Sequence, residues 1–192
     1  MDTEGAPDEA SAIKPRGSTL TVEALYEEHF AFVWRSARRL GVPMDCLDDA
    51  VQDVFLAAHR RLNEFEGRSN VKTWLFGILI NVARVFRRST RRRHNAMEAF
   101  ASSVSPEQRR VENDTPFEAA KRAQAAKILH AALETLDDDK RAALVMADFE
   151  DMSASEIATT LGANVNTIYS RIRSAREQFE RAVEVARGEV ES

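Results

Sequence analysis

Residues 154–176 read Ala-Ser-Glu-Ile-Ala-Thr-Thr-Leu-Gly-Ala-Asn-Val-Asn-Thr-Ile-Tyr-Ser-Arg-Ile-Arg-Ser-Ala-Arg, and they predict two short helices joined by a glycine turn. Ser153 and Glu156 have the spacing of a capping box, which starts the first helix. Gly162 supplies the left-handed residue that ends it, and Asn164 suits the N-cap of the second helix. This layout is that of a helix-turn-helix, with a surface helical hairpin as the alternative for the segment alone.

The predicted second helix separates apolar from polar residues. Its apolar face carries Val165, Ile168, Ile172 and Ala175 at helical spacing. The opposite face has no acidic residue and carries Asn166, Thr167, Tyr169, Ser170, Arg171, Arg173 and Arg176. A polar and basic helix that follows a glycine turn is typical of duplex DNA recognition.

The composition predicts an all-α protein of one or two domains. The 192 residues are 44% hydrophobic and 30% charged, glycine and proline are sparse, and helix-forming residues dominate. The single Cys46 excludes an internal disulfide and a cysteine-clustered zinc site. No apolar run approaches the roughly 20 residues of a membrane span, and the N-terminus lacks a signal-peptide core, so we expect a cytoplasmic protein.

The charge is segregated along the chain. The net charge of −4 would argue against a nucleic-acid partner, but the stretch from Arg68 to Arg93 holds eight cationic residues and no acid. The acids gather elsewhere, in the N-terminal residues, in 45–53 and in 137–139. A phosphate backbone responds to the local field, which decays over about 10 Å in ordinary salt. The pattern predicts nucleic acid and a protein partner.

The hydrophobic periodicity divides the chain into two helical regions. Residues 1–20 are predicted to be a disordered tail, and residues 94–114 lose the periodicity and are predicted to be a flexible interdomain linker. The first region carries helices over 21–40, 45–62 and from 71 into the arginine run. The second carries helices over 115–135 and 138–149, the helix-turn-helix and a charged helical tail. The predicted domains are 21–93 and 115–185, with 186–192 as a tail.

Two motifs in the first region suggest partners. The helix around 45–62 turns Asp48, Asp49, Gln52 and Asp53 away from its apolar face, which could be a docking surface or merely a solvated face. The polar loop before the next helix places Arg68, Ser69, Asn70 and Lys72 beside Trp74. Such a loop offers donors and a stacking surface to unpaired bases, with arginines behind it for the phosphates. The alternative makes Trp74 a core residue and the arginines a solvated face.

No catalytic constellation is present in the sequence. The four histidines are far apart, and none forms a His-x-x-x-His pair with an adjacent glutamate. A glycine-rich phosphate loop, a nucleophile elbow and a dinucleotide fingerprint are all missing. We therefore expect no enzymatic activity, no metal, no cofactor and no small-molecule substrate.

In this order, the segments resemble an extracytoplasmic-function sigma factor, a small two-domain initiation factor of bacterial RNA polymerase. The similarity covers 21–93 and 125–185. The family's Asp-x-x-Gln-(Glu/Asp)-x-Phe motif is matched by Asp49, Gln52, Asp53 and Phe55. Phe-x-Gly-x-Ser, Trp-Leu-x-x-Ile and a following Asn are matched by Phe65, Gly67, Ser69, Trp74, Leu75, Ile78 and Asn81. Glu-Ile-Ala-x-x-Leu-Gly and Thr-(Ile/Val)-x-Ser-Arg-(Ile/Leu) are matched from Glu156 through Ile172.

The resemblance implies a site for each partner. The clamp helices of the polymerase β′ subunit would contact the acidic helix through Asp48, Asp49, Gln52, Asp53 and Phe55. The melted minus-ten element would contact Arg68, Ser69, Asn70, Lys72, Trp74, Asn81, Arg84 and Arg88. The duplex minus-thirty-five element would contact Asn164, Asn166, Thr167, Tyr169, Ser170, Arg171, Arg173 and Arg176. The second domain would also meet the flap of the β subunit, and family habit implies an anti-sigma factor and a nucleoid location.

Two other functions remain open from the residues alone. A plain helix-turn-helix repressor or activator would bind a palindromic duplex without polymerase. A helical nuclease would be an enzyme, although no residue constellation supports it. Many family members have Gly at position 166 and often Lys at position 169, so Asn166 and Tyr169 make the promoter sequence unpredictable.

Overall fold

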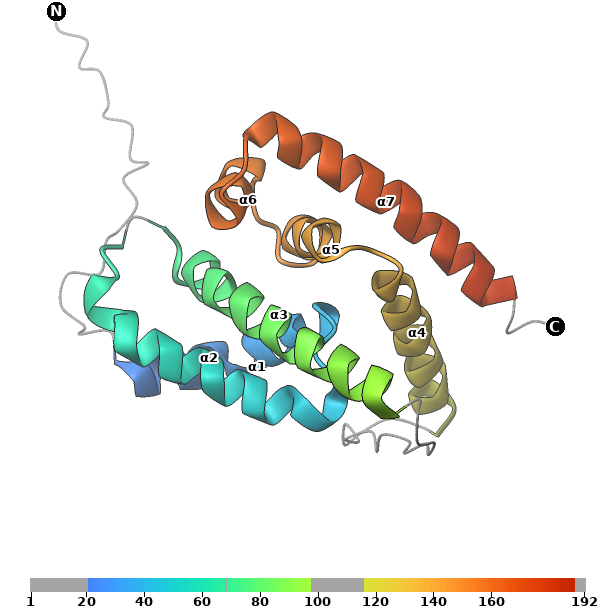
Figure 1. The fold of residues 1–192 in the computed structure, drawn as a ribbon, viewed down its shortest axis with the longest axis horizontal. Helices are drawn as coiled ribbons and strands as arrows, with labels where there is room; N and C mark the ends of the chain where they lie inside the picture. The colour runs from blue at the N-terminus through green and yellow to red at the C-terminus, as the bar shows by residue number, and fades with distance from the viewer. Residues whose placement is uncertain (1–20, 68, 98–115, 189–192) are drawn as a thin grey trace, which may run out of the picture.

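The computed structural model describes residues 21–67, 69–97 and 116–188, and every regular element in them is helical. The first group of helices is α1 (Val22–Arg39), η1 (Met44–Cys46), α2 (Leu47–Arg61), η2 (Leu62–Glu64) and α3 (Val71–Met97). The second group is α4 (Pro116–Glu134), α5 (Asp138–Leu144), the π-helix η3 (Val145–Phe149), α6 (Ala154–Leu161) and α7 (Val165–Gly188). Figure 1 shows α1–α3 on one side of the molecule and α4–α7 on the other.

The first group packs α2 against both α1 and α3. The Thr21 side chain begins α1 by accepting a hydrogen bond from the Ala24 amide at 3.2 Å. The middle of α3 is apolar on most sides, so Leu75, Phe76 and Leu79 are fully buried. α3 packs against α1 and α2 in this group and against α6 of the second group.

The helix-turn-helix is confirmed as predicted. The Ser153 hydroxyl accepts from the Glu156 amide, and the Glu156 carboxylate accepts from the Ser153 amide at 2.9 Å. Gly162 ends α6 in the left-handed conformation, with φ of 61°. The Asn164 side chain accepts from the Asn166 amide at 2.8 Å, which starts α7. The apolar face of α7 buries Ile168, Ile172 and Ala175.

Several predicted boundaries are corrected by the structure. α3 extends to Met97, so residues 94–97 of the expected linker are helical. α7 runs without a break to Gly188, so the second helix of the helix-turn-helix and the charged tail are one helix and 186–188 belong to it. Residues 94–97 contain no glycine or proline, and α7 contains none before its last residue, Gly188, so nothing there stops the helix. The expected helix over 138–149 changes to a π-helix at Val145, while 98–115 and the tail 1–20 lie outside the described residues.

The two groups of helices share one continuous apolar core. α3 packs against α6 where a Cβ at Gly77 would lie 3.6 Å from the Thr160 methyl carbon. Polar bonds reinforce this boundary, including a hydrogen bond of 2.7 Å that the Ser36 hydroxyl donates to Glu150. Gly41, with φ of 85°, has the Arg141 guanidinium as the nearest neighbour of the position where a Cβ would stand. The first and second regions are therefore docked together.

The described part of the chain has no helix long and apolar enough to cross a membrane. It also has no cluster of three or more His, Cys, Asp or Glu side chains with metal-binding geometry.

Candidate nucleic-acid and polymerase interfaces

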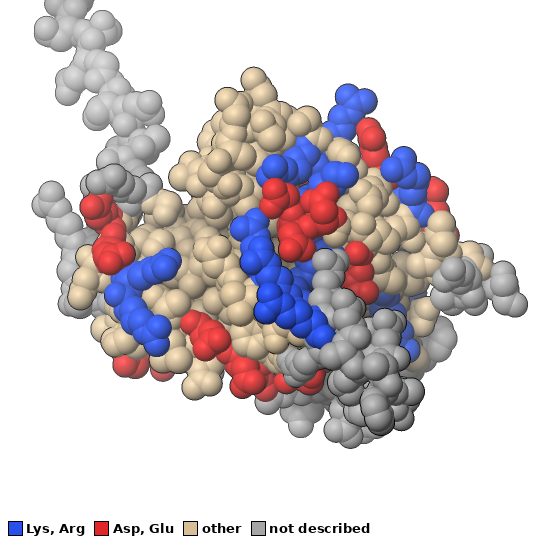
Figure 2. All heavy atoms as spheres, in the orientation of Figure 1, with Lys and Arg blue, Asp and Glu red and all other residues tan. Residues whose placement is uncertain are grey.

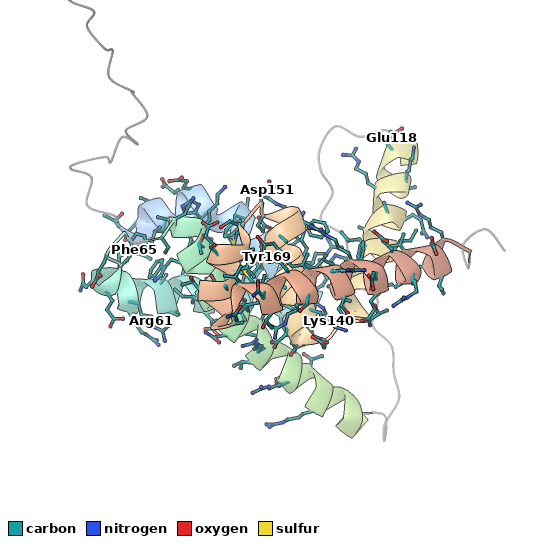
Figure 3. All side chains as sticks on the ribbon, turned by 90° about the horizontal axis from the view of Figure 1, so that it is seen from above. Arg61, Phe65, Glu118, Lys140, Asp151 and Tyr169 are labelled. Atoms are coloured by element: carbon teal, nitrogen blue, oxygen red, sulfur yellow. The ribbon has the colours of Figure 1, made fainter. Side chains whose placement is uncertain are left out.

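The N-terminal half of α7 presents a polar surface. Asn164, Asn166, Thr167 and Ser170 are exposed, and Tyr169 is 62% exposed. Figure 3 places Tyr169 on this part of α7, well away from the long extension toward the C-terminus. The buried stripe on the other side of the helix fixes which residues face outward. This is the orientation that the helix-turn-helix prediction requires.

The loop before α3 forms an aromatic pair with the start of that helix. The Phe65 and Trp74 rings lie 4.9 Å apart at 42°, and Trp74 is half-buried against the core. The Asn70 side chain accepts from the Lys72 amide at 3.0 Å, so this residue helps to start α3. Trp74 is therefore neither fully in the core nor fully exposed, because it packs against the core and beside the Phe65 ring, which is labelled in Figure 3.

The other loop and α3 residues differ in their surroundings. Ser69 and Lys72 are exposed, and the Lys72 ammonium lies 5.8 Å from the centre of the Phe32 ring. Asn81 is exposed and donates to the Gly77 carbonyl at 3.1 Å. Arg88 is exposed on the same helix, whereas Arg68 lies outside the described residues.

The acidic face of α2 is accessible. Asp48, Asp49, Gln52 and Asp53 are exposed, as predicted from their helical spacing. Phe55 differs, because it is only 5% exposed and its ring packs on Tyr26 at a centroid distance of 5.0 Å. Phe55 therefore supports the surface from beneath and presents little of itself to a partner.

Two apolar side chains near this acidic face were missed by the sequence reasoning. Leu56 is 45% exposed and Tyr26 is 47% exposed, close to the exposed Asp49, Gln52 and Asp53. An exposed leucine in the motif region was the only available signal for such a mixed surface. Acidic residues with accessible apolar side chains among them can pair with basic helices and also bury area.

Comparison with known proteins decides the family. Residues 25–93 match sigma-70 region 2, and residues 126–179 match sigma-70 region 4. The chain is 32% identical over 181 residues to the RNA polymerase sigma factor NccH of Alcaligenes xylosoxydans xylosoxydans, a match that covers 92% of this chain and 95% of the relative. This chain belongs to the sigma-70 family, in its extracytoplasmic-function class.

Other relatives agree with this assignment. The sigma factor is 30% identical to the extracytoplasmic-function sigma-E factor of Escherichia coli K12, over 74% of this chain and 76% of the relative. The solved structure of CnrH in complex with the cytosolic domain of CnrY matches with a TM-score of 0.62 and 27% identity. That match covers 85% of this chain and 88% of CnrH.

The arginines on α7 of this sigma factor have carboxylate partners. Arg171 pairs with Asp139 of α5 at 3.3 Å, and Arg173 pairs with Glu177 one turn along the same helix at 3.1 Å. Arg176 donates from Nε to Asp148 at 2.9 Å, and this hydrogen bond raises the pKa of its guanidinium further.

On α3, Arg84 also pairs with Asp139, at 2.8 Å, and Arg87 pairs with Asp138. The sequence separated the basic stretch from the acids of 137–139, but the fold brings them together. The basic stretch, which holds no acid along the chain, therefore has acidic partners in the folded chain, and Arg87 was not among the predicted site residues. These pairs join α5 to α3, far apart along the chain, so no local pattern could have revealed them.

A cleft of about 690 Å³ lies where α1 and α4 meet, and Arg38, Arg39, Lys127 and Glu134 are among its lining residues. His130 also lines this cleft. Burial, together with the positive charges of Arg38, Arg39 and Arg141, lowers the pKa of His130 from 6.5 to about 4. This imidazole is therefore neutral at physiological pH.

Proposed function

We propose that this sigma factor brings bacterial core RNA polymerase to a specific set of promoters and helps to open the DNA there. The observation that carries the proposal is the outward polar face of α7, which stands on a helix-turn-helix within sigma-70 region 4. Membership of the sigma-70 family identifies RNA polymerase as the proposed partner. The exposed residues are the proposed contacts with the polymerase and with DNA. Nucleotide transfer belongs to the polymerase, so the protein itself needs no catalytic group, metal or cofactor.

The acidic surface of α2 is the proposed contact with the clamp helices of the β′ subunit. Asp48, Asp49, Gln52 and Asp53 would pair with basic side chains there, while Tyr26 and Leu56 would bury apolar area beside them. Phe55 would hold α2 in place from below. The second domain would meet the flap of the β subunit, which sets the spacing between the two promoter contacts.

The loop before α3 and α3 itself are the proposed site for the melted minus-ten element. Ser69, Asn70 and Lys72 would donate to unpaired bases, and Trp74 would offer its accessible portion for stacking. Asn81, Arg84 and Arg88 would follow the phosphates along α3. Arg68 would join this site from the loop.

The start of α7 is the proposed reader of the duplex minus-thirty-five element. Asn164 and the outward residues Asn166, Thr167, Tyr169 and Ser170 would face the major groove, where amide and hydroxyl groups distinguish base edges. Arg171, Arg173 and Arg176 would contact bases or phosphates. With such contacts the protein would act at the nucleoid, in the cytoplasm.

An anti-sigma factor is the proposed second protein partner. CnrH, which shares this fold at 27% identity, was solved in complex with the cytosolic domain of CnrY. A comparable partner for this chain would hold it away from the polymerase until a signal arrives.

Run-off transcription tests the proposal. Purified protein is added to bacterial core polymerase with a pooled library of promoter fragments, and transcript start sites are sequenced. New start sites should appear only when the protein is present, preceded by a shared pair of sequence elements. Tight binding of a palindromic duplex without polymerase, together with no new transcripts, would instead support a plain helix-turn-helix regulator.

A further inference from the structure

A single carboxylate touches both proposed DNA-binding helices. Asp139 accepts from Arg84 of α3 through one oxygen at 2.8 Å and pairs with Arg171 of α7 through the other at 3.3 Å. Its neighbour Asp138 pairs with Arg87 of α3. Figure 2 shows acidic side chains gathered between two groups of basic ones in this part of the surface. Arg84 and Arg171, which are proposed to contact different promoter elements, thus share one carboxylate of the protein itself.

The position of these acids is set by the start of α5. Asp137 caps this helix by accepting from the Lys140 amide at 2.8 Å, so Asp138 and Asp139 occupy its first two positions. Acidic residues are favoured there by the positive end of the helix dipole. α5 itself is buried along Arg141, Ala142, Ala143 and Leu144. The two carboxylates are therefore held on a fixed support rather than on a mobile loop.

A carboxylate and a phosphate compete for the same guanidinium donors. The side chains of Arg84 and Asp139 are 33% and 49% exposed, so the pair is partly solvated and weakened by salt. A DNA backbone, which presents many phosphates at once, can displace such a pair if it can reach it. Further bonds keep the domains closed around it, such as Thr73 to Glu156 at 3.3 Å and Arg39 to Glu150 at 2.9 Å.

We propose that Asp138 and Asp139 act as an internal phosphate mimic, which occupies Arg84, Arg87 and Arg171 while the two domains are docked. In this closed arrangement the free protein binds DNA weakly, and Arg84 and Arg87 become available when the second domain moves away from α3. Arg171 lies in the same domain as Asp139, so it is released when DNA phosphates displace that carboxylate. The proposal rests on the proposed function, because it assumes that these arginines bind promoter DNA. It adds a residue pair that controls when they do so.

The first test compares two double variants of the full chain. Asp138→Asn with Asp139→Asn removes the mimic, whereas Glu23→Gln with Glu27→Gln changes the net charge equally at exposed positions of α1. Binding to a fluorescent mixed-sequence 30-base-pair duplex is followed by anisotropy across a salt series. The first variant should bind at least about tenfold more tightly than the control at low salt, with a salt slope steeper by about 2 to 3 units. Equal affinities and slopes would overturn the mimic.

A reversible lock provides a second test that does not depend on charge. Cysteines at Gly77 and Thr160, with Cys46→Ala to remove the native thiol, should form a disulfide between α3 and α6. The oxidised protein should lose duplex binding and run-off transcription at least about tenfold, and reductant should restore both. Unchanged duplex binding in the oxidised protein would overturn the closed-state proposal.

The two proposals fail in different ways. Wild-type protein that directs no transcription with core polymerase would remove the proposed function. Active wild-type protein whose asparagine variant binds like the glutamine control would remove the internal mimic alone. Thermal unfolding of each variant identifies any loss of folding at α5, and a folded variant is required for the comparison.

Discussion

At the residue scale, Arg171 combines two opposing demands. It lies on the second helix of the helix-turn-helix among the residues proposed to contact DNA, yet its side chain pairs with Asp139 and is only 22% exposed. Release of the carboxylate would leave the whole guanidinium available to a base or a phosphate, because Asp139 lies against one of its amino groups in the folded chain. Arg173 faces a weaker constraint, since its partner Glu177 lies on the same exposed helix surface.

Replacing Arg171 with alanine should weaken promoter binding of the polymerase complex. The expected loss is about 1 to 3 kcal/mol for a base contact, and a smaller salt slope for a phosphate contact. Arg181→Ala is the matched control, because Arg181 is exposed on the same helix beyond the recognition residues. Promoter binding measured by footprinting should change for the first variant only. Equal binding by both variants would argue against Arg171 as a reader of DNA.

At the element scale, α2 divides its residues between the core and a partner surface. Val51 and Val54 are buried, while Asp49 and Asp53 are exposed one turn apart. Because these carboxylates are outside the core, their replacement should leave the packing of α1, α2 and α3 intact. The helix can therefore be tested for binding separately from its role in the fold.

Changing Asp49 and Asp53 to lysine should abolish association with core polymerase. The reversed charge would repel the basic surface that the acidic helix is proposed to meet. Glu23→Lys with Glu27→Lys makes the same charge change on α1 and should retain association. Co-purification with core polymerase, together with thermal unfolding, measures both effects. Retention of the aspartate variant on the polymerase would contradict the docking role of α2.

The helices could be predicted from local sequence signals, whereas the contacts between residues far apart in the sequence could not. Ser153, Gly162 and Asn164 carry their structural instructions within a few residues, so the caps of α6 and α7 could be predicted. The exposure of Asp49 and Asp53 also followed from helical spacing. The Arg84–Asp139 pair joins residues 55 positions apart, which no window of sequence reveals. The burial of Phe55 had the same cause, because it depends on Tyr26 from another helix.

At the scale of the whole molecule, Arg141 connects the two helical groups. It is 1% exposed, and it donates to the carbonyls of Leu133 at 2.7 Å, Leu136 at 3.1 Å and Leu40 at 3.3 Å. The Leu40 carbonyl belongs to the end of α1, and the other two belong to the junction of α4 and α5. Its charge also lowers the pKa of nearby His130. Arg141 therefore both joins the two helical groups and helps to set the pKa of His130.

The stability of the fold should fall as the pH is lowered through the range from about 6.5 to 4. Because the pKa of His130 is about 4 in the folded chain and has the ordinary histidine value of 6.5 in the unfolded chain, the unfolded chain binds the proton more readily across this window. His130→Gln should flatten the loss, by at most about 3 kcal/mol. Urea unfolding at about pH 7 and about pH 4.5 measures the difference.

The exposed His59 provides the control for this experiment. His59→Gln should keep the pH dependence of the wild-type chain, because its imidazole is outside the cleft. Parallel curves for wild type and His130→Gln would contradict the assignment to His130. His29, whose pKa burial also lowers, should leave part of the dependence in every variant.

The turn at Gly41 carries a consequence for how this sequence can vary. Its positive φ disfavours any side chain, and an added carbon would meet the guanidinium that reaches the Leu40 carbonyl. In a saturation library of the chain, this short turn should rank with the deepest core positions in intolerance. Folded variants at Gly41 are expected to have lost the contact between the two helical groups. Cells that carry them should be examined for transcription in the absence of the inducing signal.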